Sequence, residues 1–183
     1  MIVLAGASAS GKTEVAKELA KKYGVTKVIT TTTRSMRVGE VNGRDYFFVS
    51  KEQFLKMIED GRFVEYTTYN ENLYGSTKDQ ISPNKCVVID PAGLKAYIAL
   101  NDKSIVTFFL DSEENTRFKR MLLRGDKEDD AKRRVEHDRT AFKKENIADV
   151  DYHIDSERYN IEEVTDTIYK LYLEALEKRG IKK

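Results

Sequence analysis

The segment GASASGKT, residues 6–13, has the residue types and spacing of a phosphate-binding loop. Its two glycines allow sharp bends and a close approach of the backbone, so that several N–H groups can point at phosphate oxygens. In this P-loop pattern, G-x-x-x-x-G-K-[ST], the lysine reaches the outer phosphates and the hydroxyl binds Mg²⁺. The predicted phosphate-binding residues are Gly6, Ala7, Ser8, Ala9, Ser10, Gly11, Lys12 and Thr13, with Thr13 as the magnesium ligand.

A second group of residues is suited to binding another anion. Arg34, Arg37 and Arg44 lie within eleven residues of one another and close to Tyr46. Guanidinium groups with a phenol hydroxyl can grip a monophosphate, although the same arginines could simply be solvated surface charge. The sequence has no [NT]-K-x-D signature, with which a GTPase reads its base. A P-loop enzyme with two anionic ligands is therefore favoured over a GTPase.

The segments around GASASGKT decide whether it is a P-loop, because an ordinary Gly/Ser-rich loop can carry the same letters. Residues 2–5 are an unbroken apolar run, which is typical of a buried parallel strand. Residues 14–23 repeat apolar side chains every four positions, as one face of a helix does. Gly24 follows where a helix end favours a left-handed residue. The order strand, loop, helix supports the P-loop.

Strand and helix patterns alternate along most of the chain, which predicts an α/β fold with a parallel sheet covered by helices on both faces. Residues 34–74 interrupt this alternation with strands of their own, so we expect an inserted lobe. The expected strands after the first are residues 27–32, 62–69, 86–89 and 104–110, and the expected helices are 50–61, one from about 112, 126–145 and one after Asn160. Ser50 and Gln53 form a capping box at the start of the first of these helices.

Two acidic residues stand where ligand chemistry is expected. Residues 62–69 alternate between two faces, with Glu65 on the same face as Phe63 and Thr67, so this strand presents polar groups that can line a cleft. Asp90 follows the apolar strand 86–89, at the end of the strand where α/β sheets place their ligands.

The helix expected over residues 126–145 is dominated by charge. Opposite charges four residues apart predict ion pairs along an exposed helix. The expected pairs are Glu128–Lys132, Asp129–Arg133 and Asp130–Arg134.

The composition argues against several kinds of partner. The chain has 183 residues, with 32 basic and 31 acidic side chains and a net charge of +1. It therefore has no overall field to attract nucleic acid or an anionic membrane. No apolar run approaches the roughly 20 residues of a membrane span, and no signal peptide is visible. We expect a single cytoplasmic domain, whose oligomeric state, monomer or dimer, the sequence leaves open.

The cysteine and the two histidines have no chemical pattern around them. Cys86 is the single cysteine and lies in an apolar run, so we expect it in the core without a disulfide. His137 and His153 lack partners spaced for metal binding or base catalysis, and we expect structural roles for both.

Two segments resemble the guanylate kinase family. TTTRSMRVGEVNGRDYFFVS, residues 31–50, is similar to the segment of these kinases that binds the nucleoside monophosphate, and FVEYTTYNENLYGST, residues 63–77, is similar to the one that follows it. With the P-loop before them and an arginine-rich lid after them, the resemblance covers residues 2–155. It implies the reaction MgATP plus GMP giving ADP plus GDP. It also implies one domain with a core (1–30, 84–111 and 141–183), a GMP-binding lobe (31–83) and a lid (112–140).

The resemblance assigns a role to each matching residue. Glu65 accepts from N1–H and the amine of guanine, while Thr30 and Ser76 read the carbonyl side of the base. The expected ATP site is residues 6–13. The expected grip on the GMP phosphate is Arg34, Arg37, Tyr46 and Tyr74, and the groups expected to stabilise the transferred phosphoryl are Lys12, Arg37, Arg124 and Arg134, with Arg120 as a further lid arginine.

The sequence departs from the family pattern at four places. Ala9 replaces a P-loop glycine, and the lid is one residue shorter between Arg124 and Arg134. The segment VIDPAG keeps one of two acids, so Asp90 faces either GMP or, indirectly, Mg²⁺. Asp155 replaces an asparagine near the adenine. A kinase for another nucleoside monophosphate and a binding module without turnover therefore stay as alternatives.

Overall fold

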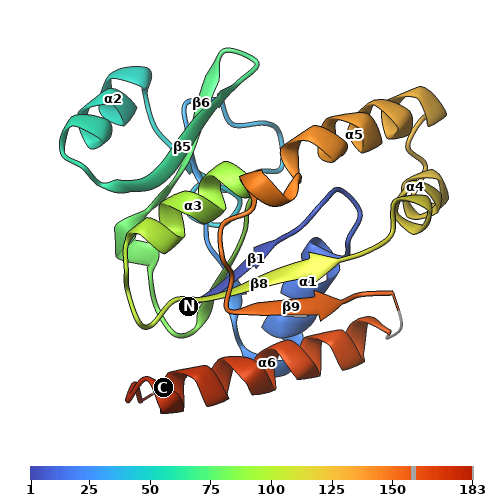
Figure 1. Ribbon diagram of the computed structural model, residues 1–183. Coiled ribbons are helices and arrows are strands. Elements are labelled where there is room, and N and C mark those ends of the chain that lie inside the picture. Colours follow the sequence, from blue (N-terminus) through green and yellow to red (C-terminus); the bar gives the residue numbers. More distant parts are fainter. Residues whose placement is uncertain (158–159, 183) are drawn as a thin grey trace.

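The computed structural model describes residues 1–157 and 160–182 (Figure 1). A parallel sheet forms the base of this part of the chain, with five strands in the order β2-β7-β1-β8-β9. From one edge to the other the strands are β2 (Thr26–Lys27), β7 (Lys85–Val88), β1 (Ile2–Ala5), β8 (Val106–Asp111) and β9 (Tyr152–Asp155).

Helices cover both faces of this sheet, which confirms the predicted α/β architecture. Ile2 and Leu4 point into the cluster formed with α1 (Lys12–Tyr23) and α6 (Ile161–Lys178). Val3 and Ala5 alternate with them and join the opposite cluster with α3 (Pro91–Ala99). Such two-sided burial explains why the strand is apolar throughout. None of the described helices is long and apolar enough to cross a membrane.

A second sheet is inserted between β2 and β7. Its strand order is β4-β3-β6-β5. Helix α2 (Lys51–Glu59) packs on it through Phe54, whose ring stacks on Phe63 at 4.4 Å between centroids. The predicted capping box of Ser50 and Gln53 is present at the start of α2. The strands are β3 (Thr31–Thr32), β4 (Phe47–Phe48), β5 (Phe63–Tyr69) and β6 (Asn72–Thr77), and the short helix η1 (Lys78–Gln80) follows.

The prediction of one strand over residues 27–32 is wrong, because this segment divides between the two sheets. β2 ends at Lys27 in the parallel sheet and β3 begins at Thr31 in the second one. Between them the side chain of Gln80 satisfies both backbone groups of Ile29, accepting from its N–H at 2.8 Å and donating to its oxygen at 2.7 Å. A side chain thus replaces the strand ladder at the crossing point.

The predicted alternation in β5 is wrong at its start. The register shifts between Phe63 and Glu65, as in a β-bulge. Phe63 therefore faces α2 together with Tyr66, while Glu65 turns away from that aromatic group. On the paired strand β6, a Cβ atom at Gly75 would lie 2.8 Å from the backbone oxygen of Glu65, so only glycine allows the two strands to approach this closely.

Helices α4 (Glu114–Leu123) and α5 (Glu128–Ala141) rise from the same end of the parallel sheet as the second sheet does, and Figure 1 shows the two groups on opposite sides of that end. The short helix η2 (Lys144–Asn146) follows α5. The predicted pair Glu128–Lys132 is confirmed, at 2.7 Å.

The other two predicted pairs on α5 are wrong. Arg133 pairs with Asp130, three residues before it, rather than with Asp129. Arg134 lies 3.7 Å from Asp126, which precedes the helix. Asp126 lies just outside the first turn, where a helix pattern does not reach.

Candidate functional site

The loop between β1 and α1 has the geometry that the P-loop pattern predicts. Gly6 has φ 144°, and a Cβ atom there would lie 2.7 Å from the oxygen of Leu110. Gly11 caps α1 with φ 99°. The Nζ atom of Lys12 donates to the backbone oxygens of Gly6 and Ala7, both at 2.8 Å. The loop therefore curls around its own lysine at the start of α1.

The Lys12 ammonium is partly buried by this loop. The pKa of Lys12 is lowered to about 8, chiefly by burial and also by the charges of Arg117 and Arg124, while the charge of Asp138 acts in the opposite direction. A buried cation without a full counter-charge is a strong site for an anion.

Ala9 adopts a conformation that glycine normally takes. Its φ is 60°, in the left-handed region. Its methyl group packs against the cluster of Met121, Ala131 and Val135 between α4 and α5. The loop thus keeps a glycine-like shape although an alanine stands there.

A cavity of about 550 Å³ lies on one side of the loop, and we call it the P-loop cavity. The exposed Thr13 stands on its wall, beside Arg120 and Arg124. Arg120 donates to the oxygen of Ser156 at 2.9 Å. The sequence analysis missed part of this wall, namely Ser156, Asn160 and Ile161. Asp155, which the sequence suggested near a base, holds the N–H of Glu157 at 2.8 Å instead of lining the cavity.

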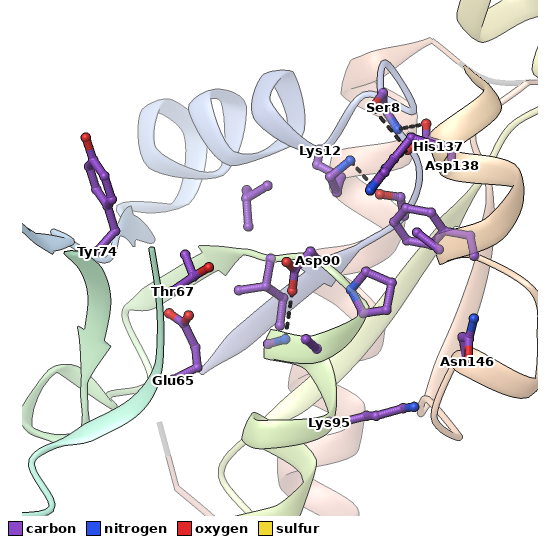
Figure 2. A pocket seen from close by; sticks show the side chains of 18 of the residues that line it. Ser8, Lys12, Glu65, Thr67, Tyr74, Asp90, Lys95, His137, Asp138 and Asn146 are labelled. Carbon is purple, nitrogen blue, oxygen red and sulfur yellow. Dashed lines mark hydrogen bonds and ion pairs between the residues drawn. The ribbon is translucent and has the colours of Figure 1, made fainter. Parts of the chain in front are cut away.

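A second cavity of about 780 Å³, the central cleft, lies between the P-loop, the second sheet and α5 (Figure 2). Lys12 lines both cavities, so the P-loop lies between them and its lysine contributes to the wall of each. The structure brings these predicted residues to the central cleft: Gly6, Ser8, Lys12, Thr30, Glu65, Tyr74 and Asp90. Thr67, which the sequence analysis placed on the same strand face as Glu65, lines the cleft as well. The sequence analysis missed these polar lining residues: Lys95, His137, Asp138 and Asn146.

Glu65 is held at one end of the cleft by a chain of hydrogen bonds. Its Oε1 accepts from the Ser76 hydroxyl at 2.7 Å and from the Ser76 N–H at 3.2 Å. The hydroxyl of the buried Tyr97 donates in turn to Ser76 Oγ at 3.0 Å. Burial raises the pKa of Glu65, the Ser76 hydrogen bonds oppose this, and the nearby charge of Asp90 adds to it. Tyr97 gave no signal in the sequence, because it fits an ordinary apolar helix position.

Asp90 is both a helix cap and a cleft residue. Its Oδ1 accepts from the N–H of Gly93 at 2.8 Å at the start of α3. The sequence analysis also allowed an indirect role for Asp90 toward Mg²⁺. Asp90 does not line the P-loop cavity, where Thr13 lies. Figure 2 shows Asp90 across the cleft from Glu65 and on the Lys12 side of it.

Three of the four residues predicted to grip a phosphate, Arg34, Tyr46 and Tyr74, lie close together at the second sheet. The Arg34 guanidinium lies 5.3 Å from the centroid of the Tyr46 ring, and the Tyr46 and Tyr74 rings are 6.2 Å apart. Glu40, which the sequence analysis missed, accepts from Arg34 at 2.7 Å and from the N–H of Arg37 at 2.7 Å.

Of this group, Tyr74 lines the central cleft, whereas Arg34, Arg37 and Tyr46 do not, and Arg37 is exposed. The structure therefore brings Arg34, Tyr46 and Tyr74 together, and of the four predicted residues only Tyr74 lines the cleft.

Two of the predicted lid arginines, Arg124 at the end of α4 and Arg134 on α5, approach the same acid, Asp126. Arg124 makes two hydrogen bonds to Asp126, at 2.7 and 2.6 Å, and Arg134 approaches the same carboxylate. Arg124 lowers the pKa of Asp126 through this contact. Asp126 was missed in the sequence, where it is one acid among several.

The cysteine and His153 have structural surroundings, as expected. Cys86 is fully buried, and burial raises the pKa of its thiol to about 11. His153 Nδ1 lies 2.9 Å from Asp111 Oδ2, outside both cavities. His137 differs from the expectation in position, because it lines the central cleft.

Comparisons with known proteins place this chain among nucleotide kinases. The sequence model of the family described as "Guanylate kinase" matches residues 1–172. A guanylate kinase of Anaplasma phagocytophilum (strain HZ) is 30% identical over 178 residues, 92% of this chain and 83% of that protein. One of Clostridioides difficile (strain 630) is 45% identical over 82 residues, which is 44% of this chain and 40% of that relative. A crystal structure of guanylate kinase from Anaplasma phagocytophilum superposes with a TM-score of 0.60 at 26% identity, covering 95% of this chain and 84% of that one.

Proposed function

The chain belongs to the guanylate kinase family, and from that premise we propose that it transfers the γ-phosphoryl group of MgATP to GMP, giving ADP and GDP. The observation that supports this most is the position of Lys12 on the walls of both cavities. A donor and an acceptor bound on opposite sides of the P-loop would meet at this side chain.

We assign ATP to the P-loop cavity, with its phosphates against residues 6–13. Within the described residues, no group of three or more His, Cys, Asp or Glu side chains could hold a metal ion. Mg²⁺ fits such a site, because it commonly takes one or two protein oxygens and leaves the rest to phosphates and water. The hydroxyl of the exposed Thr13 is the proposed protein ligand, and Asp90 would act only indirectly. The ion supplies neutralisation of phosphate charge.

We assign the guanine of GMP to the Glu65 end of the central cleft. A carboxylate there accepts two hydrogen bonds, from N1–H and from the exocyclic amine, and adenine does not present that pair. Thr30, which lines the cleft, is the proposed hydroxyl for the carbonyl side of the base. Ser76, predicted for the same role, is buried and its hydroxyl already donates to Glu65, so its proposed part is to hold that carboxylate. The phosphate of GMP is assigned to the grip of Arg34, Arg37, Tyr46 and Tyr74.

The proposed chemistry is an in-line transfer between phosphates. An oxygen of the GMP phosphate attacks the γ-phosphorus, and the bond from that phosphorus to the bridging oxygen of ADP breaks. The attacking oxygen is already an anion, so no general base is required, and catalysis rests on positioning and charge. Lys12, Arg37, Arg124 and Arg134 are the cations proposed to stabilise the charge of the moving group.

The same assignment divides the chain by role. Residues 1–30, 84–111 and 141–183 form the proposed core, residues 31–83 the GMP-binding lobe and residues 112–140 the lid. Two small nucleotides are the proposed partners of the protein.

A coupled assay of ADP formation tests the proposal. ADP should form from MgATP only when GMP is added, with a strong preference over AMP, CMP and UMP. The variant Lys12→Ala should abolish the signal and keep the circular dichroism spectrum. Equal rates with GMP and AMP would refute the role of Glu65 and favour a kinase of broader specificity. Binding of GMP without any ADP would favour a module that lacks turnover.

A further inference from the structure

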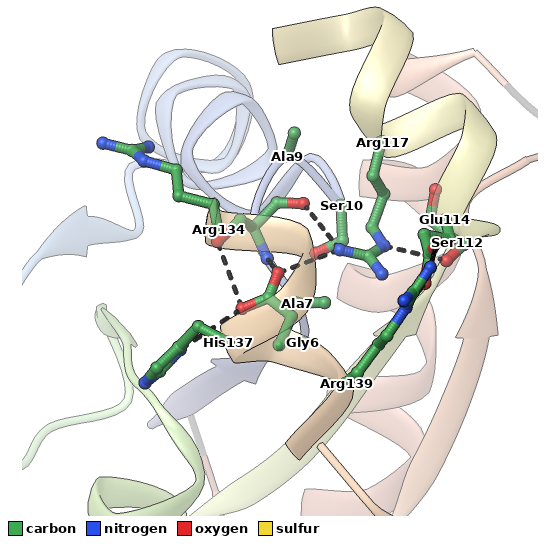
Figure 3. Close-up of polar contacts among 12 residues, drawn as sticks. Gly6, Ala7, Ala9, Ser10, Ser112, Glu114, Arg117, Arg134, His137 and Arg139 are labelled. Carbon is green, nitrogen blue, oxygen red and sulfur yellow. Dashed lines mark hydrogen bonds and ion pairs between the residues drawn. The ribbon is translucent and has the colours of Figure 1, made fainter. Parts of the chain in front are cut away.

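A buried ion pair between α4 and α5 is hydrogen-bonded to the P-loop (Figure 3). Oδ2 of Asp138 accepts from the N–H of Ser8 at 2.8 Å and from Arg117 Nη1 at 2.9 Å, and Oδ1 accepts from the Ser8 hydroxyl at 3.3 Å. The side chains of Arg117 and Asp138 are only 8% and 6% exposed. Removing two charges from water is costly, and such pairs persist where hydrogen bonds satisfy both partners.

Arg117 completes the contact from the other side. Its Nη1 also donates to the oxygen of Ser8 at 3.4 Å, and its Nε donates to the oxygen of Ser112 at 3.2 Å. Ser8 therefore has both of its backbone groups held by the pair. Three segments meet here: the P-loop, the start of α4 and the last part of α5.

The position of this contact on α5 links it to Arg134. Asp138 lies four residues after Arg134, so the two side chains share a face of the helix one turn apart. The contact between Asp138 and Ser8 therefore sets how far the backbone of Arg134 lies from the P-loop and in which direction its side chain starts. The segment around Asp126 lies beyond this contact, before the first turn of α5.

We propose that Asp138, held by Arg117, is a positioning residue that docks α5 on the P-loop so that Arg134 is presented to the phosphoryl group in transfer. This inference rests on the proposed function. Asp138 does not touch the reacting atoms in this role, because its oxygens are occupied by Ser8 and Arg117. An opposite reading is that its charge competes with the donor phosphates for the N–H of Ser8, and the experiment separates the two.

The test uses a double variant, Arg117→Met with Asp138→Ala. Removing Asp138 alone would strand a buried guanidinium, whereas replacing both charges by apolar groups is commonly tolerated. The matched control is Arg139→Gln. Arg139 is the next residue on α5 and also bridges to α4, through two bonds to Glu114 at 2.7 and 2.5 Å, but this pair is exposed and does not touch the P-loop.

Three readouts are compared, namely kcat at saturating nucleotides, the KM for GMP from a titration at saturating ATP, and amide hydrogen exchange. In the double variant kcat should fall about tenfold or more, since small displacements of catalytic groups have effects of that size. The KM for GMP should stay within about twofold, because the Glu65 end of the cleft is untouched. Amide hydrogen exchange over residues 6–13 should become faster. Arg139→Gln should leave kcat and exchange near the wild-type values.

The variant Asp138→Asn separates geometry from charge. Its amide oxygen can still accept from Ser8 and Arg117, and its amide nitrogen can donate to the Ser8 hydroxyl. The Arg117 guanidinium then keeps a hydrogen-bond acceptor but loses its counter-charge, so the positioning role predicts a kcat and an exchange rate closer to the wild-type values than those of the double variant. A kcat that rises in both Asp138 variants would overturn the role in favour of charge competition.

The double variant tests the positioning role of Asp138, and the wild-type protein tests the proposed function. A double variant with wild-type kcat and exchange overturns the positioning role alone. A wild-type protein that forms no ADP with GMP overturns the proposed function, in the same assay.

Discussion

At the scale of single residues, the central cleft depends on side chains whose chemistry is set by their neighbours. Lys12 is a cation held in a partly buried loop, and Glu65 is an acid held by a serine and, behind it, a tyrosine. The tyrosine hydroxyl that supports Glu65 can be removed by substitution while the Glu65 carboxylate itself stays in place.

The pKa of Lys12 predicts how donor binding depends on pH. It is lowered by burial to about 8, and only the protonated amine pairs with phosphates. We therefore expect kcat/KM for ATP to fall as the pH rises through about 8, because this parameter reports the free enzyme. At saturating ATP the bound phosphates favour the charged amine, so kcat should persist to higher pH. A kcat/KM that stays level up to the ordinary lysine value of about 10.4 would contradict this expectation.

Tyr97 predicts an effect on one substrate only. Tyr97→Phe removes the donor to Ser76 Oγ and leaves Glu65 less firmly oriented. The KM for GMP should rise about fivefold, the equivalent of roughly 1 kcal/mol for one hydrogen bond, with the KM for ATP unchanged.

The control for this variant is Tyr172→Phe. It removes another buried tyrosine hydroxyl, bonded to the oxygen of Pro83 at 2.9 Å and outside both cavities. A rise in the KM for GMP in both variants would show a general loss of stability rather than a role for Tyr97 at Glu65.

At the scale of elements, helix α3 positions two residues of the central cleft, and the P-loop contains a strained residue, Ala9. Asp90 caps α3, and Tyr97 follows seven residues later, two turns along the same face. One short helix thus places Asp90 in the cleft and, through Tyr97 and Ser76, holds Glu65 in position. The P-loop holds Ala9 in a left-handed conformation, which disfavours residues that have a Cβ atom.

Substitutions at Ala9 should rank by their tolerance of that conformation. Ala9→Gly should be as stable as the wild type or up to about 1 kcal/mol more stable, because relief of roughly 1–2 kcal/mol is partly offset by the entropy of glycine. Ala9→Val should lose more than about 1 kcal/mol, since a β-branched residue is poorly accommodated at positive φ. Urea unfolding measures both. A valine variant as stable as the wild type would refute strain at this position.

At the scale of the whole molecule, the catalytic cations proposed here are spread over two groups of elements. Arg37 is exposed and lies in the segment that joins β3 to β4 of the second sheet, and Arg134 belongs to α5. Neither lines the central cleft. These groups flank the same end of the parallel sheet in Figure 1, so both must move inward if both cations are to reach one phosphoryl group.

Closure should make the molecule more compact. We expect the radius of gyration, measured by small-angle X-ray scattering, to decrease when GMP and a non-hydrolysable ATP analogue bind together. Either nucleotide alone should produce a smaller decrease, because each brings in one group of elements. A radius that is the same with both nucleotides as with none would contradict the closure.

Much of the fold follows from patterns that span a few residues. The P-loop, the capping box at Ser50, the apolar strands and the helix after Asn160 depend on neighbours in the chain, and the structure has all of them. The resemblance to the guanylate kinase family also pointed to Glu65, which lines the central cleft. These features are local, so the order of the residues already contains their physical cause.

The sequence by itself determined the α/β class, the P-loop and the family of this protein. Tertiary structure alone decided that residues 27–32 divide between two sheets, that Arg134 faces Asp126, and that Asp138 reaches Ser8 across 130 positions of the chain. The physical reason is that a hydrogen bond or a charge takes whichever partner the packed chain brings within reach, and for these groups that partner is remote in sequence or outside the periodic pattern.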